Sequence, residues 1–286
     1  MNRFDYLKPR TLEEVFRLLD QYGDRARLIA GATDLLVMIR QKKLSPDVLI
    51  SLRGIPGLDH VESNGEFKIG ALVTHRRIEQ SEEIRRYFPI LSLASGQLGS
   101  VQVRNVGTLG GNLCTASPSA ETAPALLVYE AQVHLVSEKG ERCLPLETFF
   151  LGPGETALGK KEVLKEVLLP YPPTHSRGVY LKLGRRRSVD LAVVNVAVLL
   201  TLNPSTRICE RARIALGAVA PTPIRAKKAE KVLEGNPLED RLIERAAEEA
   251  RQECHPITDI RGSAEYRKAM VGVLVEKAIR QSIEGS

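Results

Sequence analysis

Apolar residues at the start of the chain recur with a period that changes from helical to extended. Between residues 12 and 19 they fall three or four positions apart, as one face of a helix requires. Thr11 precedes this run and Glu14 follows three residues later, which is the pattern of a capping box. The next apolar runs predict a strand, a helix and a strand over residues 26–30, 35–39 and 48–52. We therefore expect the chain to open with a small βαβ-like unit.

The middle of the chain alternates between extended and helical patterns. The predicted strands cover residues 67–74, 132–137, 142–146 and 163–169, and the predicted helices cover 76–96, with a break at Pro89, and 120–129. A proline-rich link over residues 170–174 follows and is the expected domain boundary. We expect one domain over residues 1–174, divided into subdomains of about 1–54 and 55–174, and a second domain over 175–286.

The second domain begins with strands and ends with helices. The predicted strands cover residues 178–184, 191–202 and 207–219, and the last two helical segments, 238–254 and 264–283, are amphipathic. Strands that precede helices, without regular alternation, indicate an α+β class.

Composition and charge narrow the possible functions. The net charge of +6 first suggests a nucleic-acid binder, but the basic residues are spread along the chain, only 5% of residues are aromatic and Trp is absent. A non-enzymatic basic binding protein therefore stays as a rival hypothesis, and no nucleic-acid partner is expected.

The chain has no apolar run long enough to span a bilayer and no apolar signal region at its start, so we expect a cytoplasmic protein.

Cysteine and histidine spacing argues against a metal centre. The four cysteines, Cys114, Cys143, Cys209 and Cys254, lie far apart and form no CxxC pair. No two histidines are three or four positions apart, so nothing in the sequence favours a metal site held by this chain alone.

Two glycine-containing segments are the candidates for binding chemistry. The first is Ala30 to Asp34, between a predicted strand and a predicted helix, and the second is Gly107 to Asn112. Glycine lets backbone N–H groups approach a ligand closely, and such groups attract phosphate. Neither segment has the GxGxxG pattern of a dinucleotide-binding domain. The GxxxxGK match that begins at Gly154 has Lys161 where a phosphate-binding loop needs Ser or Thr.

The stretches AGATDLL, QVRNVGTLGGNLCTASPSAETAPALL and FFLGPGETAL carry a family resemblance. In this spacing the chain resembles the FAD-binding subunits of the molybdenum hydroxylases, which include the medium subunit of aerobic carbon monoxide dehydrogenase and the flavin domain of xanthine dehydrogenase. The resemblance covers nearly the whole chain. It implies a vanillyl-alcohol-oxidase-like fold of two small subdomains that hold FAD without a covalent bond. A C-terminal domain with a three-stranded antiparallel sheet and helices would follow.

The resemblance also implies roles for particular residues. The pyrophosphate of FAD would be bound by Ala30, Gly31, Ala32, Thr33 and Asp34 and by Thr108, Gly110, Gly111 and Asn112. The stretch from Ser117 to Glu121 would follow the cofactor, with Glu121 near its ribose or adenine end. Leu164 would pack on the isoalloxazine, Lys182 would place a cation near the flavin ring, and Asp190 would lie beside the flavin edge.

Two other features near these positions have simpler, structural interpretations. His75 invites the idea of a covalent flavin, but the family holds FAD non-covalently and this residue opens a predicted helix, so we interpret it as structural. The basic cluster Arg185 to Arg187 could bind an anionic acceptor, although a solvated turn is the simpler interpretation.

The implied function is electron transfer within an oxidoreductase complex. A molybdopterin large subunit would oxidise the substrate, an iron–sulfur small subunit would pass electrons to FAD on this chain, and an external acceptor would receive them. The implied assembly is a dimer of heterotrimers, and no catalytic acid or base is expected here. The alternative is a self-sufficient flavin oxidase or reductase of the same fold. The sequence identifies neither the substrate nor the acceptor.

Overall fold

The N-terminal unit is a small parallel sheet with helices beside it. The computed structural model describes residues 3–186 and 189–284. The unit contains β1 (Asp5–Leu7), α1 (Leu12–Tyr22), β2 (Ala26–Ile29), α2 (Leu35–Arg40) and β3 (Val48–Ser51), with the strands in the order β1-β3-β2. Thr11 caps α1 by accepting a hydrogen bond from the Glu14 N–H, as its position in the sequence predicts. The three-residue β1 was not expected from the sequence, because so short a strand has no detectable period.

The central part is an antiparallel sheet covered on one face by short helices. Its strands, in the order β4-β5-β10-β6-β7, are β4 (Val61–Asn64), β5 (Glu66–Gly70), β10 (Val163–Leu169), β6 (Gln132–Ser137) and β7 (Gly140–Pro145). The other elements are α3 (His75–Gln80), α4 (Glu82–Tyr87), α5 (Pro89–Gly96), α6 (Val101–Val106), α7 (Leu109–Thr115), α8 (Thr122–Val128), α9 (Leu146–Phe149), β8 (Phe150–Gly152) and β9 (Glu155–Thr156). Phe67, Phe88 and Tyr129 lie in the core between this sheet and the helices.

Two expectations for the central part need correction. The helical stretch over 76–96 breaks at Pro89 as predicted, where α5 begins, but it has a further, unexpected break at Ser81, which caps α4, so that it forms three helices. The segment 107–112, expected as a glycine-rich loop, contains the start of α7, and Thr108 is its N-cap. Three glycines in five residues suggest a turn, but a short helix tolerates them when neighbouring segments pack against it.

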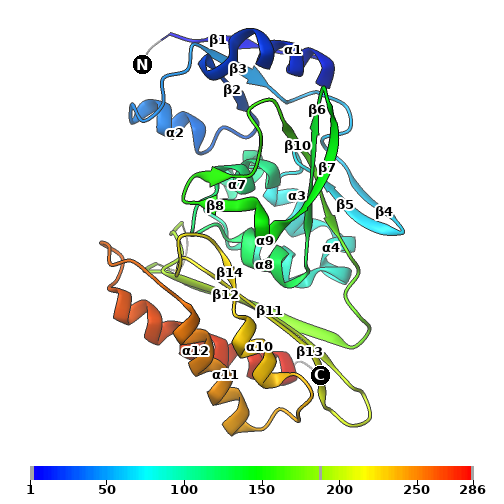
Figure 1. The fold of residues 1–286 in the computed structure, drawn as a ribbon, viewed down its shortest axis with the longest axis vertical. Coiled ribbons are helices and arrows are strands. Elements are labelled where there is room, and N and C mark those ends of the chain that lie inside the picture. The colour runs from blue at the N-terminus through cyan, green and yellow to red at the C-terminus, as the bar shows by residue number, and fades with distance from the viewer. Residues whose placement is uncertain (1–2, 187–188, 285–286) are drawn as a thin grey trace.

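The C-terminal part is an antiparallel sheet with three helices on its outer face (Figure 1). It contains β11 (Ser176–Leu183), β12 (Val194–Leu202), β13 (Cys209–Gly217), β14 (Ile224–Arg225), α10 (Lys227–Leu233), α11 (Asp240–Glu253) and α12 (Ala264–Glu284). The three long strands agree with the predicted α+β domain, and the two-residue β14 adds a short fourth strand beside β13. The inner face of this sheet packs against α5 and α8 of the central part.

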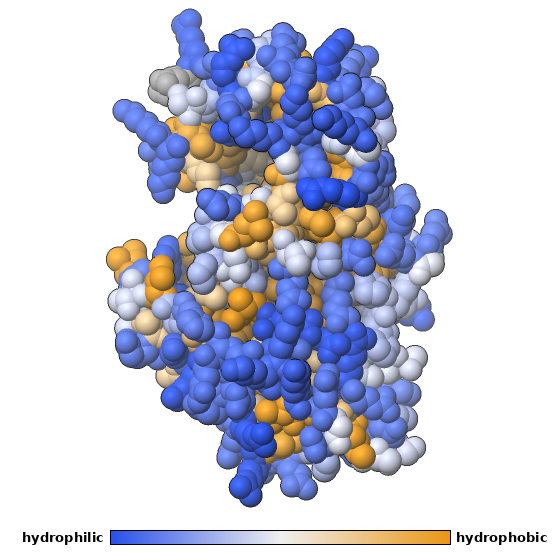
Figure 2. Space-filling view, viewed as in Figure 1, coloured by the Kyte–Doolittle hydropathy of each residue, from blue (hydrophilic) through white to orange (hydrophobic). Residues whose placement is uncertain are grey.

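The three parts stack along the long axis of the molecule, with the N-terminal unit at one end and the C-terminal helices at the other (Figure 1). Figure 2 shows that this face is hollowed between the N-terminal unit and the middle of the molecule, and that apolar side chains line the hollow. In the part of the chain that the structure describes, no helix has the length and apolar character needed to cross a bilayer.

Candidate functional site

A cavity of about 500 Å³ lies where the three parts of the molecule meet. Residues of the β2–α2 loop form one side of it, the start of α7 and the segment after it form another, and Leu164 on β10 contributes an apolar surface. The loop that precedes β12 brings Asp190 to the same cavity. The expected site residues that line it are Ala30, Gly31, Ala32, Thr33, Asp34, Thr108, Gly110, Gly111, Asn112, Ser117, Glu121, Leu164 and Asp190.

The β2–α2 loop packs directly against the turn between α6 and α7. A Cβ atom on Gly31 would lie 2.2 Å from the Val106 carbonyl oxygen, so only glycine allows this approach. Ala32 has a φ of 66°, in the left-handed region, so the chain turns at this residue and does not continue as a regular helix or strand. Among the described residues, no protein acceptor is bonded to the backbone N–H groups of residues 31–34. These amides are therefore available to an anionic ligand.

The second glycine segment differs from the first because its backbone N–H groups already have acceptors within the protein. The N–H groups of Leu109 and Gly110 donate to the Val73 and Ala71 carbonyl oxygens at 3.0 and 2.9 Å. The Gly111 N–H donates to the Thr108 hydroxyl oxygen at 3.1 Å, and the Asn112 N–H donates to the carbonyl oxygen of the same threonine. The expectation that both segments offer free amides therefore does not hold in this structure, because the fold itself uses those of the second segment.

Polar side chains around α7 supply hydrogen-bonding groups at the cavity wall, which the backbone amides of α7 do not. The Asn112 carbonyl oxygen Oδ1 accepts a hydrogen bond from the Thr122 hydroxyl at 2.5 Å, which fixes the amide plane and leaves its NH₂ group toward the cavity. Ser117 and Ser119 share a hydrogen bond of 3.1 Å at the end of this wall. Ser119, which belongs to the stretch from Ser117 to Glu121 that the resemblance placed along the cofactor, lines the cavity as well.

Glu121 and Lys182 form a buried ion pair beside the cavity. Glu121 is the N-cap residue of α8, and its Oε1 lies 2.8 Å from the Lys182 ammonium. Burial raises the pKa of Glu121, and the nearby lysine opposes that shift. The ammonium also donates to the Gln97 and Asp190 carbonyl oxygens, so all three of its hydrogens have acceptors. Lys182 itself is not among the residues that line the cavity.

The loop before β12 is held by the side chain of Asp190. Its Oδ2 accepts hydrogen bonds from the N–H groups of Arg185 and Arg186 at 2.6 and 3.0 Å. Burial would raise the pKa of Asp190, but these backbone donors lower it below its usual value. Arg187, the third residue of the basic cluster, lies outside the described residues. Val189 and Leu191 place partly exposed apolar side chains at the rim of the cavity.

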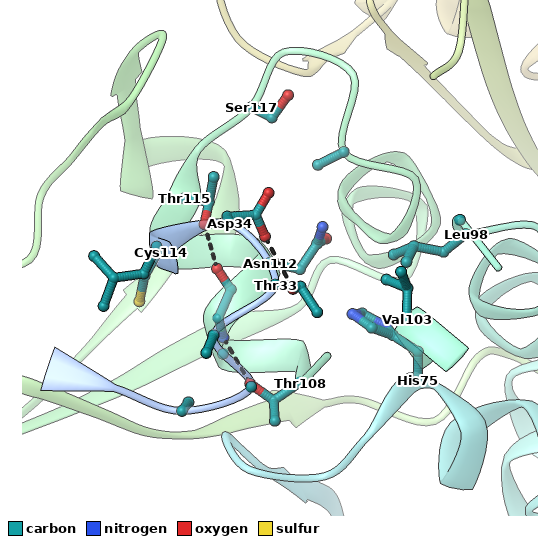
Figure 3. Close-up of a pocket in the computed structure, with 18 of the residues that line it drawn as sticks. Thr33, Asp34, His75, Leu98, Val103, Thr108, Asn112, Cys114, Thr115 and Ser117 are labelled. Carbon is teal, nitrogen blue, oxygen red and sulfur yellow. Dashed lines mark hydrogen bonds between the residues drawn. The ribbon is translucent and has the colours of Figure 1, made fainter. Parts of the chain in front are cut away.

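Several lining residues were not identified from the sequence as site residues. Figure 3 shows His75, Leu98 and Val103 on one side of the cavity and Cys114 and Thr115 on another. Leu98 and Val103 come from the turn before α6 and from that helix, which no motif connects with the glycine segments. His75 was singled out for its residue type, but its position on the cavity wall depends on the tertiary packing of α3.

The arrangement suits an extended ligand with an anionic centre and flat apolar parts. Free backbone amides and the Asn112 NH₂ group can hold a diphosphate, while Leu164 and Leu191 offer surfaces for planar rings. The cavity volume lies within the usual range of cofactor pockets, roughly 300–1,000 Å³.

Comparison with known proteins identifies the class of protein to which this arrangement belongs. Residues 2–172 match the family described as the FAD binding domain in molybdopterin dehydrogenase. Residues 179–282 match the CO dehydrogenase flavoprotein C-terminal domain. The chain therefore belongs to the FAD-binding subunits of the molybdopterin dehydrogenases, which are oxidoreductases, and its cofactor is FAD. Its C-terminal domain is of the carbon monoxide dehydrogenase flavoprotein type.

Individual relatives agree over nearly the whole chain. The sequence is 33% identical to the 6-hydroxypseudooxynicotine dehydrogenase complex subunit alpha of Paenarthrobacter nicotinovorans, covering 98% of this chain and 94% of that protein. It is 32% identical to the carbon monoxide dehydrogenase medium chain of Hydrogenophaga pseudoflava, covering 97% and 96%. A solved structure of carbon monoxide dehydrogenase from Hydrogenophaga pseudoflava superposes with a TM-score of 0.95 at 33% identity, covering 98% of this chain and 97% of that one.

Proposed function

We propose that this chain is the FAD-carrying electron-transfer subunit of a molybdenum-containing hydroxylase or dehydrogenase complex. A molybdopterin large subunit would oxidise the substrate, and an iron–sulfur small subunit would conduct the electrons to this chain. An external acceptor would then receive them at the cavity rim. The observation that carries this proposal is the cavity itself, in which free amides of residues 31–34 face a wall of polar and apolar groups in a chain of this family.

In this proposal the chain binds and orients the cofactor, and no side chain of the cavity needs to move a proton. When bound, FAD supplies redox chemistry that can exchange one or two electrons, and the protein tunes it through contacts and charge. Residues 31–34 and Asn112 would hold the diphosphate, and Ser117 would lie beside the cofactor chain. Glu121 would accept a hydrogen bond from a sugar hydroxyl rather than meet a phosphate, because two negative groups repel. Leu164 would pack on the isoalloxazine.

Lys182 would act through its neighbours. Its ammonium is fully engaged by Glu121, Gln97 and Asp190, so we propose that it keeps the Glu121 carboxylate charged and holds the loop before β12. The cation near the flavin ring that the family resemblance implied for Lys182 stays a prediction.

We further propose that residues 1–174 form the FAD-binding domain, with subdomains of about 1–54 and 55–174, and that 175–286 form the C-terminal domain. The spans of the two matched families support this division. The names of relatives as complex subunits or medium chains support assembly with partner chains, for which we propose a cytoplasmic dimer of heterotrimers.

The first prediction tests this function directly. The chain purified from its native source should carry FAD, with a visible flavin spectrum, and should co-purify with an iron–sulfur chain and a molybdopterin chain. Substrate should bleach the flavin in the complex but not in the isolated, FAD-loaded chain. Bleaching of the isolated chain by an organic substrate, with no iron or molybdenum in the native preparation, would instead establish a self-sufficient flavin oxidase or reductase.

A further inference from the structure

The Asn112 side chain on the cavity wall is held by a residue that lies outside the cavity. Thr122, the first residue of α8, is fully buried, and its hydroxyl donates a hydrogen bond of 2.5 Å to Asn112 Oδ1. Asn112 lines the cavity, whereas Thr122 is not among the lining residues. Figure 3 shows the Asn112 amide directed into the cavity. The hydrogen bond therefore connects the protein interior with a group that a ligand can meet.

The helix that carries Thr122 has a fixed place in the core. All seven residues of α8 are buried, and the helix packs against α5 and α7 on the central side and against β12 and β13 of the C-terminal sheet. Close-packed interiors allow little displacement of a buried backbone. Thr122 therefore offers its hydroxyl to Asn112 from one fixed point.

The two ends of the Asn112 amide have different surroundings. Oδ1 is occupied by the Thr122 hydroxyl. Nδ2 has no acceptor among the described residues, and it is not one of the side-chain atoms that the protein encloses without a partner. This nitrogen is therefore open to the cavity, with two N–H groups to donate.

The orientation of this amide matters because its two ends interact in opposite ways with an anion. The NH₂ group donates to a phosphate oxygen, whereas the amide oxygen repels it. The terminal torsion of asparagine is soft, so an amide without a partner can turn and present either end. The segment that starts α7 depends on this donor, because the backbone N–H groups of residues 109–112 already have protein acceptors.

We propose that Thr122 is a positioning residue for FAD, whose hydroxyl holds the Asn112 amide with its NH₂ group toward the diphosphate. Thr122 acts through Asn112 and does not itself touch the cofactor. This inference rests on the proposed function as an FAD carrier. None of the roles that the family resemblance implied falls on Thr122.

The second prediction tests this role with the full chain, stripped of FAD and titrated with it under flavin fluorescence. Thr122→Val keeps the shape without the hydroxyl and should weaken FAD binding by about threefold to tenfold, the usual weight of a neutral hydrogen bond. Asn112→Ala removes a donor to a charged group and should weaken binding by about tenfold to a hundredfold. The double variant should bind FAD as Asn112→Ala does, because Thr122 acts only through this amide. Thr122→Ser keeps the hydroxyl and should retain most of the affinity.

Asn112→Asp tests whether the amide faces the diphosphate. Its carboxylate can still accept from Thr122 but turns a negative oxygen toward the phosphates, so it should weaken FAD binding more than Asn112→Ala does. A matched control is Thr201→Val. Thr201 is also buried and bonds to the Ser176 hydroxyl at 2.8 Å, but it does not line the cavity, so its loss should leave FAD affinity unchanged.

The inference is overturned if the losses of the two single variants multiply in the double variant, because Thr122 would then act independently of Asn112. Wild-type affinity in Thr122→Val would overturn it as well, and so would a loss in Asn112→Asp no greater than in Asn112→Ala. If Thr122→Val does not fold, Thr122→Ala takes its place in the same comparison. A wild-type chain that takes up no FAD would reject the proposed function itself.

Discussion

At the scale of residues, the cavity depends on close approach of backbone to backbone. Gly31 touches the turn at Val106, and Gly110 lies so near Ala71 that a Cβ atom would be 2.6 Å from the alanine side chain. The first contact brings two segments that are far apart in sequence to the wall of one cavity. The second packs α7 against the end of β5. Gly31 and Gly110 are therefore needed for packing between protein segments, in addition to the close approach of a ligand that the sequence predicted for them.

The third prediction concerns Gly31→Ala. The new methyl group would meet the Val106 carbonyl oxygen, so the loop must move away, and overpacking of this kind costs on the order of 1–3 kcal/mol. FAD affinity should fall by about tenfold or more, measured by fluorescence titration, since 1.4 kcal/mol corresponds to a factor of ten. Gly272→Ala is the control, because its nearest neighbour would lie at 3.9 Å in a helix, and it should bind FAD normally. Equal affinity in both variants would contradict the packing argument.

At the scale of elements, β10 connects the cavity with a polar cluster on the other face of the central sheet. Leu164 faces the cavity, and after a bulge Glu166 points to the opposite side. There its carboxylate bonds to His60 Nε2 at 2.9 Å and to His134 Nδ1 at 2.8 Å. Burial raises the pKa of Glu166, but the hydrogen bonds from His134 and His60, together with the nearby positive charge of Lys68, lower it overall. The cluster therefore fixes the register of the strand that carries Leu164.

The fourth prediction follows from the sign of that shift. A carboxyl group whose pKa is lowered in the folded state stabilises the fold above its unfolded pKa, near 4.5, and loses this contribution as the pH falls through the folded value. Glu166→Gln should reduce the free energy of unfolding by about 1–3 kcal/mol at pH 7. The gap between the variant and the wild type should narrow below about pH 4.5 in urea titrations. The exposed Glu62→Gln should stay within about 0.5 kcal/mol at every pH. A gap that is constant with pH would contradict this assignment.

At the scale of the whole molecule, the cavity is shared by all three stacked parts. The N-terminal unit supplies the free amides, the central part supplies Leu164 and α7, and the C-terminal part supplies Asp190 and Leu191. Lys182 joins the last two parts through Glu121 and Gln97. A ligand in this cavity would therefore contact all three parts of the molecule.

The fifth prediction is that FAD binding stiffens the outer parts of the molecule together. Hydrogen exchange of the amides at residues 31–34 and of Leu191 should slow on addition of FAD, whereas amides in the middle of β13 should not change. Unfolding should also require about 2.7 kcal/mol more at an FAD concentration of a hundred times Kd. Protection confined to residues 31–34, without any at Leu191, would show that the C-terminal part does not close the site.

Local patterns in the sequence predicted the helices with clear periods and caps, as at Thr11, and the long strands of the C-terminal sheet. They also predicted that the two glycine segments bind a ligand, because glycine lets backbone N–H groups approach a ligand closely. These features depend on residues a few positions apart. The same reasoning failed for β1 and for α7, where a short element is stabilised by neighbours distant in the chain.

The sequence by itself determined the family and the cofactor, and it predicted the two segments that line the cavity, because glycine content and side-chain size can be recognised from a few neighbouring residues. Only the tertiary structure decided which groups remain available to a ligand. The amides of residues 109–112 are used by Val73, Ala71 and Thr108, and the Lys182 ammonium is used by three acceptors, whereas the described acceptors of the protein leave the amides of residues 31–34 free. A hydrogen-bonding group has a limited number of partners, and long-range packing decides which of them the protein itself provides.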